Sequence, residues 1–262
     1  MSKKIFIFTT GRTGSVTLYN FFKSNLNVLA LHEGTNRNLG INLTDFKNFN
    51  KKIFYDKGFK IDNKYNLDPD SVQYLLKLYK SREQLFEKHQ DKIIVDINPY
   101  QYLLSKFLLK KYPKATFVLL IRNGLDVVNS YHQRDKTTYP NISENEYKGW
   151  ASGKPRPLHD DIHLKNWRTY DRVQKISWFW SYINSNLYKS LNTSSNFSIL
   201  KTENLPSIKN VVKSYKDYDF SILDKRHNKA KRNTDIWTKE AITTFNKIAG
   251  DTMQSFGYDL TA

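Results

Sequence analysis

The 262-residue chain contains no cysteine, and it has no long apolar run. The missing cysteines exclude a disulfide framework, a thiolate metal site and a cysteine nucleophile, and they fit a reducing compartment. The apolar run at residues 5–8 is too short for the core of a signal peptide, and a bilayer span needs about 20 apolar residues. We therefore expect a soluble, cytoplasmic protein with no membrane span.

Acidic residues are also few, with 25 Asp and Glu against 42 Lys and Arg, which gives a net charge of +17. This balance favours anionic partners such as nucleotides, sulfated molecules or nucleic acid, although a lysine-rich solubilising surface has the same composition. Aromatic residues make up 15% of the chain and indicate a folded protein, because disordered chains are poor in them. Without internal repeats or a low-complexity linker, residues 1–262 are predicted to form a single domain.

The order of the predicted elements indicates an α/β fold. A buried strand at 5–8, a glycine-rich loop at 9–15 and a helix at 16–25 form the start of a nucleotide-binding unit. Hydrophobic patterns predict further strands at 28–31, 92–95, 116–121 and 197–200, and further helices at 68–88, 102–111, 125–134, 170–191 and 237–256. This order predicts a three-layer, P-loop-like fold in which helices flank a central, mostly parallel sheet. Residues 135–165 show little periodicity and are predicted to be one long functional loop.

The loop after the first strand has the sequence Phe8-Thr-Thr-Gly-Arg-Thr-Gly-Ser-Val-Thr-Leu18. Its glycines allow the backbone to approach an anion, and successive N–H groups in such a loop bind oxyanions. The following helix adds its positive N-terminal end, and Arg12 adds a fixed cation. The Gly-Lys-Ser/Thr sequence of P-loop kinases is absent, because Ser15 follows Gly14. The motif predicts a phosphate-binding loop, and a plain glycine-rich turn is the alternative.

A second motif places Arg122 at the end of the strand at 116–121 and Ser130 two helical turns into the next helix. Ligands of open α/β sheets bind outside the carboxyl ends of the strands, so Arg122 is expected in the same crevice as the first loop. We expect Arg122 and the Ser130 hydroxyl to hold a second anionic group. An ordinary turn at the start of a helix would contain the same residues.

Together, these two segments resemble the PAPS-dependent sulfotransferase family. In that family a Lys/Arg-Ser-Gly-Ser/Thr loop binds the 5′-phosphosulfate, and the sequence from Arg12 to Ser15 resembles the arginine version of bacterial and carbohydrate-type members. The family binds the 3′-phosphate with an Arg at a strand end and a Ser eight residues later, as at Arg122 and Ser130. Weaker similarities occur at Trp180 and at residues 199–205, 228–237 and 256–258.

The resemblance implies PAPS as the sulfuryl donor, PAP as the product and no metal ion. The donor-binding residues that it implies are Gly11, Arg12, Thr13, Gly14, Ser15, Val16, Thr17, Arg122 and Ser130, with Lys229, Lys231 and Arg232 as looser assignments in the late basic loop. Thr13 replaces the usual Ser and keeps a hydroxyl. Val16 replaces the usual Ser or Thr and removes one phosphate donor.

Sulfuryl transfer resembles phosphoryl transfer, so Arg12 is the candidate that stabilises the transferring group. The acceptor needs a general base. Several carbohydrate-type members use a Glu about twenty residues after the loop cation, so Glu33 is the first candidate, and His32 is the second. Adjacent residues of an extended strand point to opposite faces, so one of the two is expected in the cleft. Asp96, which is expected to end a strand, and His132 are the other candidates.

The acceptor is expected to be a small molecule or a glycan with a hydroxyl or amine, such as a carbohydrate or a polyol-type metabolite. Residues 36–66 and 135–165 are predicted to wall its site, because their Lys, Arg and aromatic residues, including Trp150, suit a glycan or an anionic polyol. Two other functions compete with this interpretation: a P-loop-like nucleotide kinase or hydrolase, and a basic nucleic-acid-binding protein. Since no nucleic-acid-binding motif is present, a nucleic-acid partner is not expected.

Overall fold

The computed structural model describes residues 3–33, 52–53, 67–134, 154–158, 161–212, 218–224 and 236–260. In these parts of the chain, five strands form one parallel sheet in the order β2-β3-β1-β4-β5. The strands are β1 (Lys4–Thr9), β2 (Val28–His32), β3 (Ile93–Asn98), β4 (Thr116–Ile121) and β5 (Phe197–Lys201). The predicted α/β fold with a central parallel sheet between helices is confirmed.

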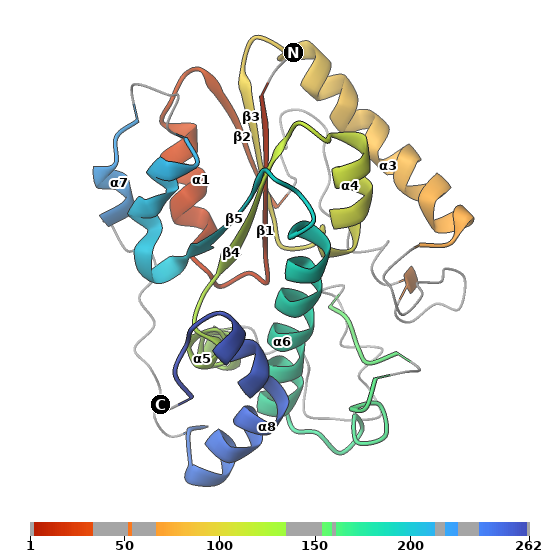
Figure 1. Cartoon of the computed structure of the whole chain (residues 1–262), viewed down its shortest axis with the longest axis vertical. Coiled ribbons are helices and arrows are strands. Elements are labelled where there is room, and N and C mark those ends of the chain that lie inside the picture. Colours follow the sequence, from red (N-terminus) through yellow and green to blue (C-terminus); the bar gives the residue numbers. More distant parts are fainter. Residues whose placement is uncertain are drawn as a thin grey trace.

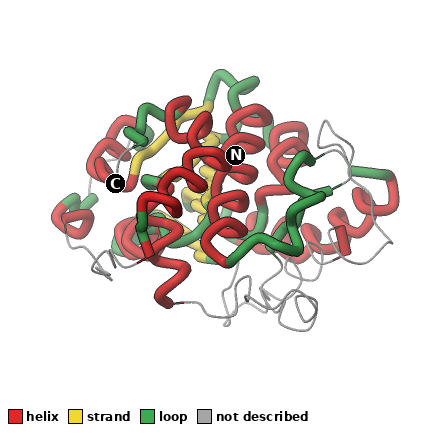
Figure 2. The backbone as a smooth tube through the Cα atoms, turned by 90° about the horizontal axis from the view of Figure 1, so that it is seen from below, coloured by secondary structure: helices red, strands yellow, loops and turns green. Residues whose placement is uncertain are grey.

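Helices cover both faces of the sheet. They are α1 (Ser15–Lys23), α3 (Pro69–Lys88), α4 (Ser105–Lys111), α5 (Gly124–Arg134), α6 (Arg172–Leu191), α7 (Ser221–Asp224) and α8 (Lys239–Ser255), with 3-10 helices η2 (Tyr102–Leu104) and η3 (Thr202–Asn210). Figure 1 shows α1 and α7 on one face and α3, α4 and α6 on the other. The view from below in Figure 2 shows the strands enclosed between these helical layers.

Residues along β1 alternate between two hydrophobic cores. Ile5 and Ile7 pack in the core beneath α1, whereas Phe6 and Phe8 pack in the core beneath α3, α4 and α6. All four side chains are fully buried. A parallel strand covered on both faces needs apolar residues at every position, which explains the unbroken apolar run at the start of the sequence.

The connections of the sheet diverge at the carboxyl end of β1. This strand lies between β3 and β4. The chain leaves β1 toward α1, which covers one face, and it leaves β3 toward α4, which covers the other (Figure 1). Ligands of open α/β sheets bind where the connections diverge in this way. The loop between β1 and α1 lies at this point.

Capping side chains set several helix boundaries. The carboxylate of Asp68 accepts hydrogen bonds from the N–H groups of Asp70 and Ser71, so the helix predicted at 68–88 begins at Pro69 with Asp68 as its cap. The helix predicted at 170–191 begins at 172 because Asp171 caps it, and the helix predicted at 237–256 begins at 239 because Thr238 caps it. The helix predicted at 102–111 consists of η2 followed by α4.

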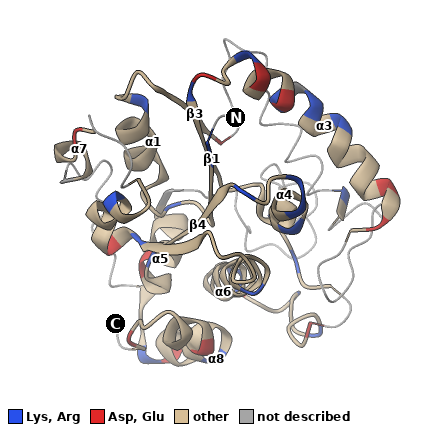
Figure 3. Cartoon of the chain, turned by 45° about the horizontal axis from the view of Figure 1, so that its top comes forward, with Lys and Arg blue, Asp and Glu red and all other residues tan. Residues whose placement is uncertain are grey.

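Basic side chains are spread over the described helices. Lys and Arg alternate with Asp and Glu along α3, and α4 carries a short basic band (Figure 3). Within the described parts of the chain, no helix is both long enough and apolar enough to cross a lipid bilayer.

Candidate active site

The loop between β1 and α1 contains three residues with a left-handed backbone. Gly11 has a φ of 80°, Arg12 a φ of 60° and Gly14 a φ of 79°. Glycine adopts this conformation without steric cost, whereas the Cβ of Arg12 makes it strained. Backbone strain in a non-glycine residue is concentrated at functional sites. A backbone that turns in this way forms a nest in which successive N–H groups face an anion.

The peptide group between Thr10 and Gly11 is fixed at both ends. Its carbonyl oxygen accepts hydrogen bonds from Oη of Tyr131 at 2.6 Å and from Nζ of Lys154 at 3.4 Å. Its N–H donates to Oγ1 of Thr9 at 3.1 Å. The loop is therefore preorganised at the point where it leaves β1, and a ligand would not have to order it.

Side chains of other elements also hold two further carbonyl groups of the loop. Nη1 of Arg122 donates to the carbonyl oxygen of Arg12 at 3.2 Å. Oγ1 of Thr202, which directly follows β5, donates to the carbonyl oxygen of Thr13 at 2.6 Å and lies 3.1 Å from that of Ile121. The carbonyl groups of Thr10, Arg12 and Thr13 are thus bound to neighbouring elements, and the N–H groups that follow Gly11 remain for a ligand.

These N–H groups lead into the first turn of α1. Among the described residues, no acceptor bonds the N–H groups of Arg12, Thr13 or Gly14. The first N–H groups of a helix also lack intrahelical partners, and the helix dipole favours negative charge at that end. The donors of this loop and helix start are therefore of the kind that suits a phosphate or sulfate group.

Arg12, Arg122 and Ser130 lie together beside this loop. Nε of Arg12 donates to Oγ of Ser130 at 3.0 Å. Arg122 contacts the carbonyl of Arg12, and its Nη2 lies 3.4 Å from Oδ2 of Asp126, one turn into α5. The three residues expected to bind the two ends of a nucleotide therefore form one connected group in the structure.

The turn after β4 is braced by the residues that carry the weaker similarities in the sequence. Nε1 of Trp180 donates to the carbonyl oxygen of Arg122 at 3.1 Å. Oε1 of Glu203 accepts from the N–H of Asn123 at 2.9 Å, and its Oε2 accepts from Oη of Tyr258 at 2.9 Å. Burial, with the nearby Glu203 carboxylate, raises the pKa of Tyr258, which keeps this phenol a donor. Arg122 is thus positioned from α6, η3 and the C-terminal segment.

His32 contacts the start of α1 from the end of β2. Its Nε2 lies 3.1 Å from Oγ of Ser15, the first residue of α1. Burial lowers the pKa of His32, and the neighbouring Glu33 carboxylate partly opposes this shift. Glu33 has a left-handed φ of 54° and donates its N–H to the carbonyl of Ile97 at 2.7 Å. The alternation of faces expected for an extended pair does not apply here, because β2 ends at His32.

The expectation that Asp96 ends a strand is wrong. β3 continues to Asn98, and Asp96 is fully buried beneath α3, where it forms an ion pair with Arg82. Burial raises the pKa of Asp96, and the Arg82 guanidinium opposes this rise. A carboxylate that is enclosed and paired in this way cannot reach an acceptor hydroxyl, so its place in the structure is that of a core ion pair.

His132 lies near the end of α5 and is half-buried. Burial and the nearby Arg172 guanidinium lower its pKa. Arg172 donates from Nη1 to the carbonyl oxygen of His132 and from Nη2 to that of Tyr131, both at 2.7 Å. The main chain of His132 thereby helps to attach α5 to the start of α6.

The other residues predicted to bind the donor differ in exposure, and some lie outside the described residues. Val16 is 41% exposed, whereas Thr13 and Thr17 are buried, and the hydroxyls of Thr13 and Thr9 are hydrogen-bonded to each other. The Thr13 side chain therefore shapes the loop from inside. Lys229, Lys231 and Arg232 lie outside the described residues, as do Trp150 and most of the two segments predicted to wall the acceptor site.

Sequence reasoning missed Lys154, Tyr131 and Thr202, which hold the loop from three different elements. Lys154 is 2% exposed, and the centroids of the Tyr100, Tyr131 and Phe179 rings lie 5.1, 5.0 and 4.5 Å from its Nζ. No local pattern marks these residues, because each acts across a long stretch of sequence. For Lys154 and Thr10 the separation is 144 positions.

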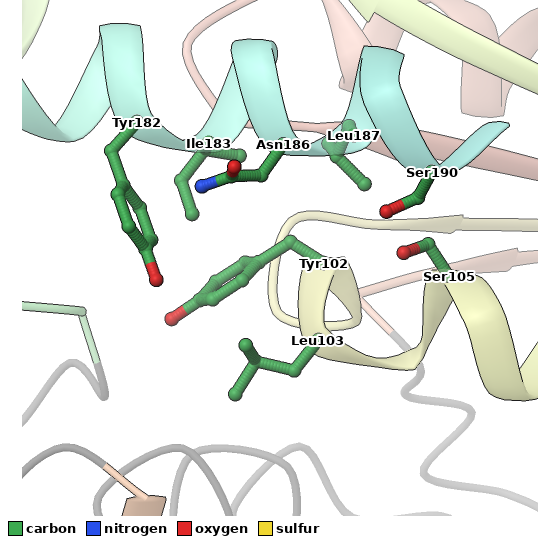
Figure 4. Close-up of a pocket in the computed structure, with 8 residues that line it drawn as sticks. All are labelled: Tyr102, Leu103, Ser105, Tyr182, Ile183, Asn186, Leu187 and Ser190. Carbon is green, nitrogen blue, oxygen red and sulfur yellow. The ribbon is translucent and has the colours of Figure 1, made fainter. Parts of the chain in front are cut away.

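A separate groove lies between α6 and the segment formed by η2 and α4 (Figure 4). In this view, the phenol groups of Tyr102 and Tyr182 point toward one another, and Ser105 faces Ser190 across the groove. The lining residues are Tyr102, Leu103, Ser105, Tyr182, Ile183, Asn186, Leu187 and Ser190. None of them is basic, so the groove is unsuited to the phosphates of a nucleotide. No cluster of His, Cys, Asp and Glu that could hold a metal ion occurs among the described residues.

The fold matches two solved structures over nearly the whole length of both partners. One is the sulfotransferase domain of the olefin synthase from Synechococcus PCC 7002, with a TM-score of 0.50, 14% identity, and coverage of 99% of this chain and 96% of that one. The other is a sulfotransferase from Alicyclobacillus acidocaldarius, with a TM-score of 0.51, 11% identity, and coverage of 99% and 97%. The chain has a sulfotransferase fold. No family model and no curated protein sequence matches it.

Proposed function

We propose that the protein is a sulfotransferase that moves a sulfuryl group from PAPS to a hydroxyl or amine of a carbohydrate or small polyol and releases PAP. The observation that carries the proposal is the loop after β1, whose carbonyls at Thr10, Arg12 and Thr13 are bound by other elements while Arg12, Arg122 and Ser130 gather beside it. The sulfotransferase fold of the chain supports it.

In this proposal the donor lies across the loop with one phosphate at each end. The N–H groups of residues 12–17 and the guanidinium of Arg12 bind the 5′-phosphosulfate. Arg122 and the Ser130 hydroxyl bind the 3′-phosphate. Lys229, Lys231 and Arg232 are proposed to add further positive charge. The 3′-phosphate separates this donor from ATP and ADP, and the loop has no lysine where P-loop kinases carry one.

The reaction is an in-line displacement at sulfur. The acceptor oxygen or nitrogen forms a bond to sulfur, the bond from sulfur to the phosphate oxygen breaks, and PAP leaves with the electron pair. Arg12 and the loop N–H groups stabilise the charge that develops on the transferring and leaving oxygens. The acceptor proton passes to a base at the end of β2, for which Glu33 and His32 are the candidates.

Two observations support His32 in this role beside the sequence argument for Glu33. Its Nε2 already lies 3.1 Å from Ser15 in the donor loop. Burial lowers its pKa, so the imidazole is neutral and can accept a proton at neutral pH. Under this assignment His32→Gln abolishes turnover and leaves PAP binding in place, whereas Glu33→Gln keeps turnover. The reverse pattern would assign the base to Glu33.

The first experiment measures thermal stabilisation by PAP, with ADP and ATP as controls. A ligand at 100 times its Kd should stabilise the folded protein by about 2.7 kcal/mol. We expect a clear shift with PAP, a weak one with ADP, and loss of the PAP shift in Arg122→Ala. Arg168→Ala removes an exposed arginine that is not among the proposed donor-binding residues, so its PAP shift should match that of wild type. Equal shifts with PAP and ADP in the wild type would instead favour a kinase or hydrolase.

Activity is then tested with radiolabelled PAPS and a panel of sugars, polyols and amines. Label transferred to a carbohydrate or polyol, and absent in Arg12→Ala, is the expected result. A wild-type protein that binds PAP but modifies none of the panel would contradict the proposed acceptor class. Binding to random DNA that PAP does not displace would favour a nucleic-acid-binding protein instead.

A further inference from the structure

Lys154 is a buried cation directly behind the phosphate loop. It begins the described segment 154–158, within the long loop predicted to wall the acceptor site. Its side chain is almost fully enclosed, with 2% of the residue exposed. Its Nζ donates to Oη of Tyr131 at 2.9 Å and to the carbonyl oxygen of Thr10 at 3.4 Å.

Three aromatic rings surround the ammonium group. The ring centroids of Tyr100, Tyr131 and Phe179 lie between 4.5 and 5.1 Å from Nζ. These rings come from three separate stretches of the chain, and their negative faces stabilise a cation. Burying an ammonium group in such a place is unfavourable unless hydrogen bonds and aromatic faces compensate. A leucine or methionine would fill the same space without that penalty, so the charge itself needs an explanation.

Lys154 and Tyr131 act on the same peptide group of the loop. Tyr131 donates to the carbonyl of Thr10 at 2.6 Å while it receives the hydrogen bond from Lys154. Its Oη also fills the space beside Gly11, where an added Cβ would lie only 2.7 Å from it. The ammonium group therefore fixes the orientation of Tyr131 and of the Thr10–Gly11 peptide, which sets the direction of the N–H groups that follow.

We propose that Lys154 is a positioning residue of the donor site, which orients the phosphate loop through the Thr10 carbonyl and Tyr131 and places a positive charge behind the bound anion. Because Lys154 belongs to the segment on the acceptor side, the same contact joins the two halves of the active site. This inference rests on the proposed function for the identity of the anion. The orientation of the loop does not depend on that identity.

The test compares Lys154→Met, which keeps the packing and removes the charge, with Lys77→Met, which removes an exposed lysine of α3. Calorimetry measures the Kd of PAP and of inorganic pyrophosphate. Hydrogen exchange measures protection of the Gly11 N–H, which is bonded to Thr9 in the wild type. We expect Lys154→Met to weaken PAP binding by roughly 10- to 100-fold, since hydrogen bonds to charged groups are the strong ones, and to speed Gly11 exchange. Lys77→Met should change neither.

A second variant separates the charge from the fold. Lys154→Ala leaves a space lined by aromatic rings, a phenol and a carbonyl, which fits a small ammonium ion. Added ethylammonium should restore PAP affinity to Lys154→Ala in a saturable way, and it should have no effect on Lys154→Met, where the space is filled. Wild-type affinity and Gly11 protection in Lys154→Met would overturn the proposal. If wild type binds pyrophosphate but not PAP, the proposed function fails, and Gly11 exchange still decides the role of Lys154.

Discussion

Nε of Arg12 lies 3.0 Å from Oγ of Ser130, so the loop after β1 contacts the middle of α5 across 118 positions of sequence. In the proposed donor complex, Arg12 binds the 5′-phosphosulfate and Ser130 the 3′-phosphate. In this proposal the two phosphate positions are therefore neighbours. Binding of the donor exchanges the contact between Arg12 and Ser130 for contacts from each residue to a phosphate oxygen.

Replacing Ser130 by alanine tests this relationship. The variant loses one hydrogen bond to a charged phosphate, so we expect the Kd of PAP to rise roughly 10-fold or more, in line with about 1.5–3 kcal/mol for such a bond. ADP lacks the 3′-phosphate, and its weaker binding should not change. Isothermal calorimetry with both nucleotides measures the difference.

The ADP arm is the control within this experiment. Removal of the Ser130 hydroxyl also frees Arg12, which would affect both nucleotides equally if that were its only effect. A loss of affinity that is the same for PAP and ADP would therefore place Ser130 away from the 3′-phosphate and assign it to the positioning of Arg12.

Substitution by alanine should change the free energy of unfolding in opposite directions at two glycines, Gly11 and Gly250. Gly11 has a φ of 80°, and an added Cβ would lie 2.7 Å from Oη of Tyr131, so Gly11→Ala should destabilise the protein by about 1–3 kcal/mol. Gly250 lies within α8, and an added Cβ there would meet its nearest atoms at 3.6 and 3.9 Å. Gly250→Ala should therefore be neutral or stabilise by roughly 0.4–1 kcal/mol. Chemical denaturation of both variants gives the comparison.

The variant Tyr131→Phe separates the two causes of the stability loss expected in Gly11→Ala, the steric clash and the backbone strain. It removes the oxygen that would clash with the new Cβ but does not change the backbone requirement at Gly11. Tyr131→Phe also loses its own hydrogen bonds to Thr10 and Lys154, so the cost of Gly11→Ala is measured against Tyr131→Phe alone. In that background Gly11→Ala should cost less stability than in wild type, and the remaining cost is the part due to φ. No remaining cost would mean that the left-handed backbone of Gly11 contributes little to stability.

Local chemistry allowed much of the fold, and the glycine-rich loop after β1, to be predicted. The strand, loop and helix at the N-terminus are contiguous in sequence. Glycines in a short loop indicate a left-handed backbone, which Gly11 and Gly14 both adopt. Arg122 and Ser130 are eight residues apart on one strand and helix, so their positions also follow from local geometry. Contacts that join distant segments have no such signal. Lys154 and Thr202 reach the loop from 144 and 189 positions away.

Asp96 shows why a strand pattern alone misleads about a site. The apolar run that predicts the strand stops at this carboxylate, and the sequence contains no indication that Arg82 of α3, fourteen positions earlier, neutralises it. The pairing lets the strand continue to Asn98, because a buried charge with a partner is tolerated inside a sheet.

Asp96→Asn should therefore act on stability and leave catalysis intact. Loss of one partner of a buried ion pair leaves Arg82 uncompensated, which costs about 3–5 kcal/mol. We expect urea unfolding to show this loss, and we expect kcat per folded molecule to match wild type. The double variant Arg82→Met/Asp96→Asn should recover most of the stability, because neither charge is then buried alone. A fall in kcat with unchanged stability would return Asp96 to the candidates for the general base.

The pKa of His32 makes stability depend on pH in one direction. Burial lowers this pKa below its ordinary value of 6.5, so the folded state binds a proton less readily than the unfolded state. The stability that follows is present above about pH 6.5 and is lost as pH falls through the pKa of the folded protein. His32→Gln can still bond Ser15 and has no group that titrates in this range.

The free energy of unfolding should therefore fall more steeply in wild type than in His32→Gln as pH is lowered from 7.5 to 5. Urea unfolding at several pH values measures the difference between the two proteins, which should shift in favour of His32→Gln on the acid side. Identical slopes would mean that His32 titrates alike in the folded and unfolded states. In that case its contact with Ser15 would not depend on a neutral imidazole, and the argument for His32 as the base over Glu33 would lose its electrostatic support.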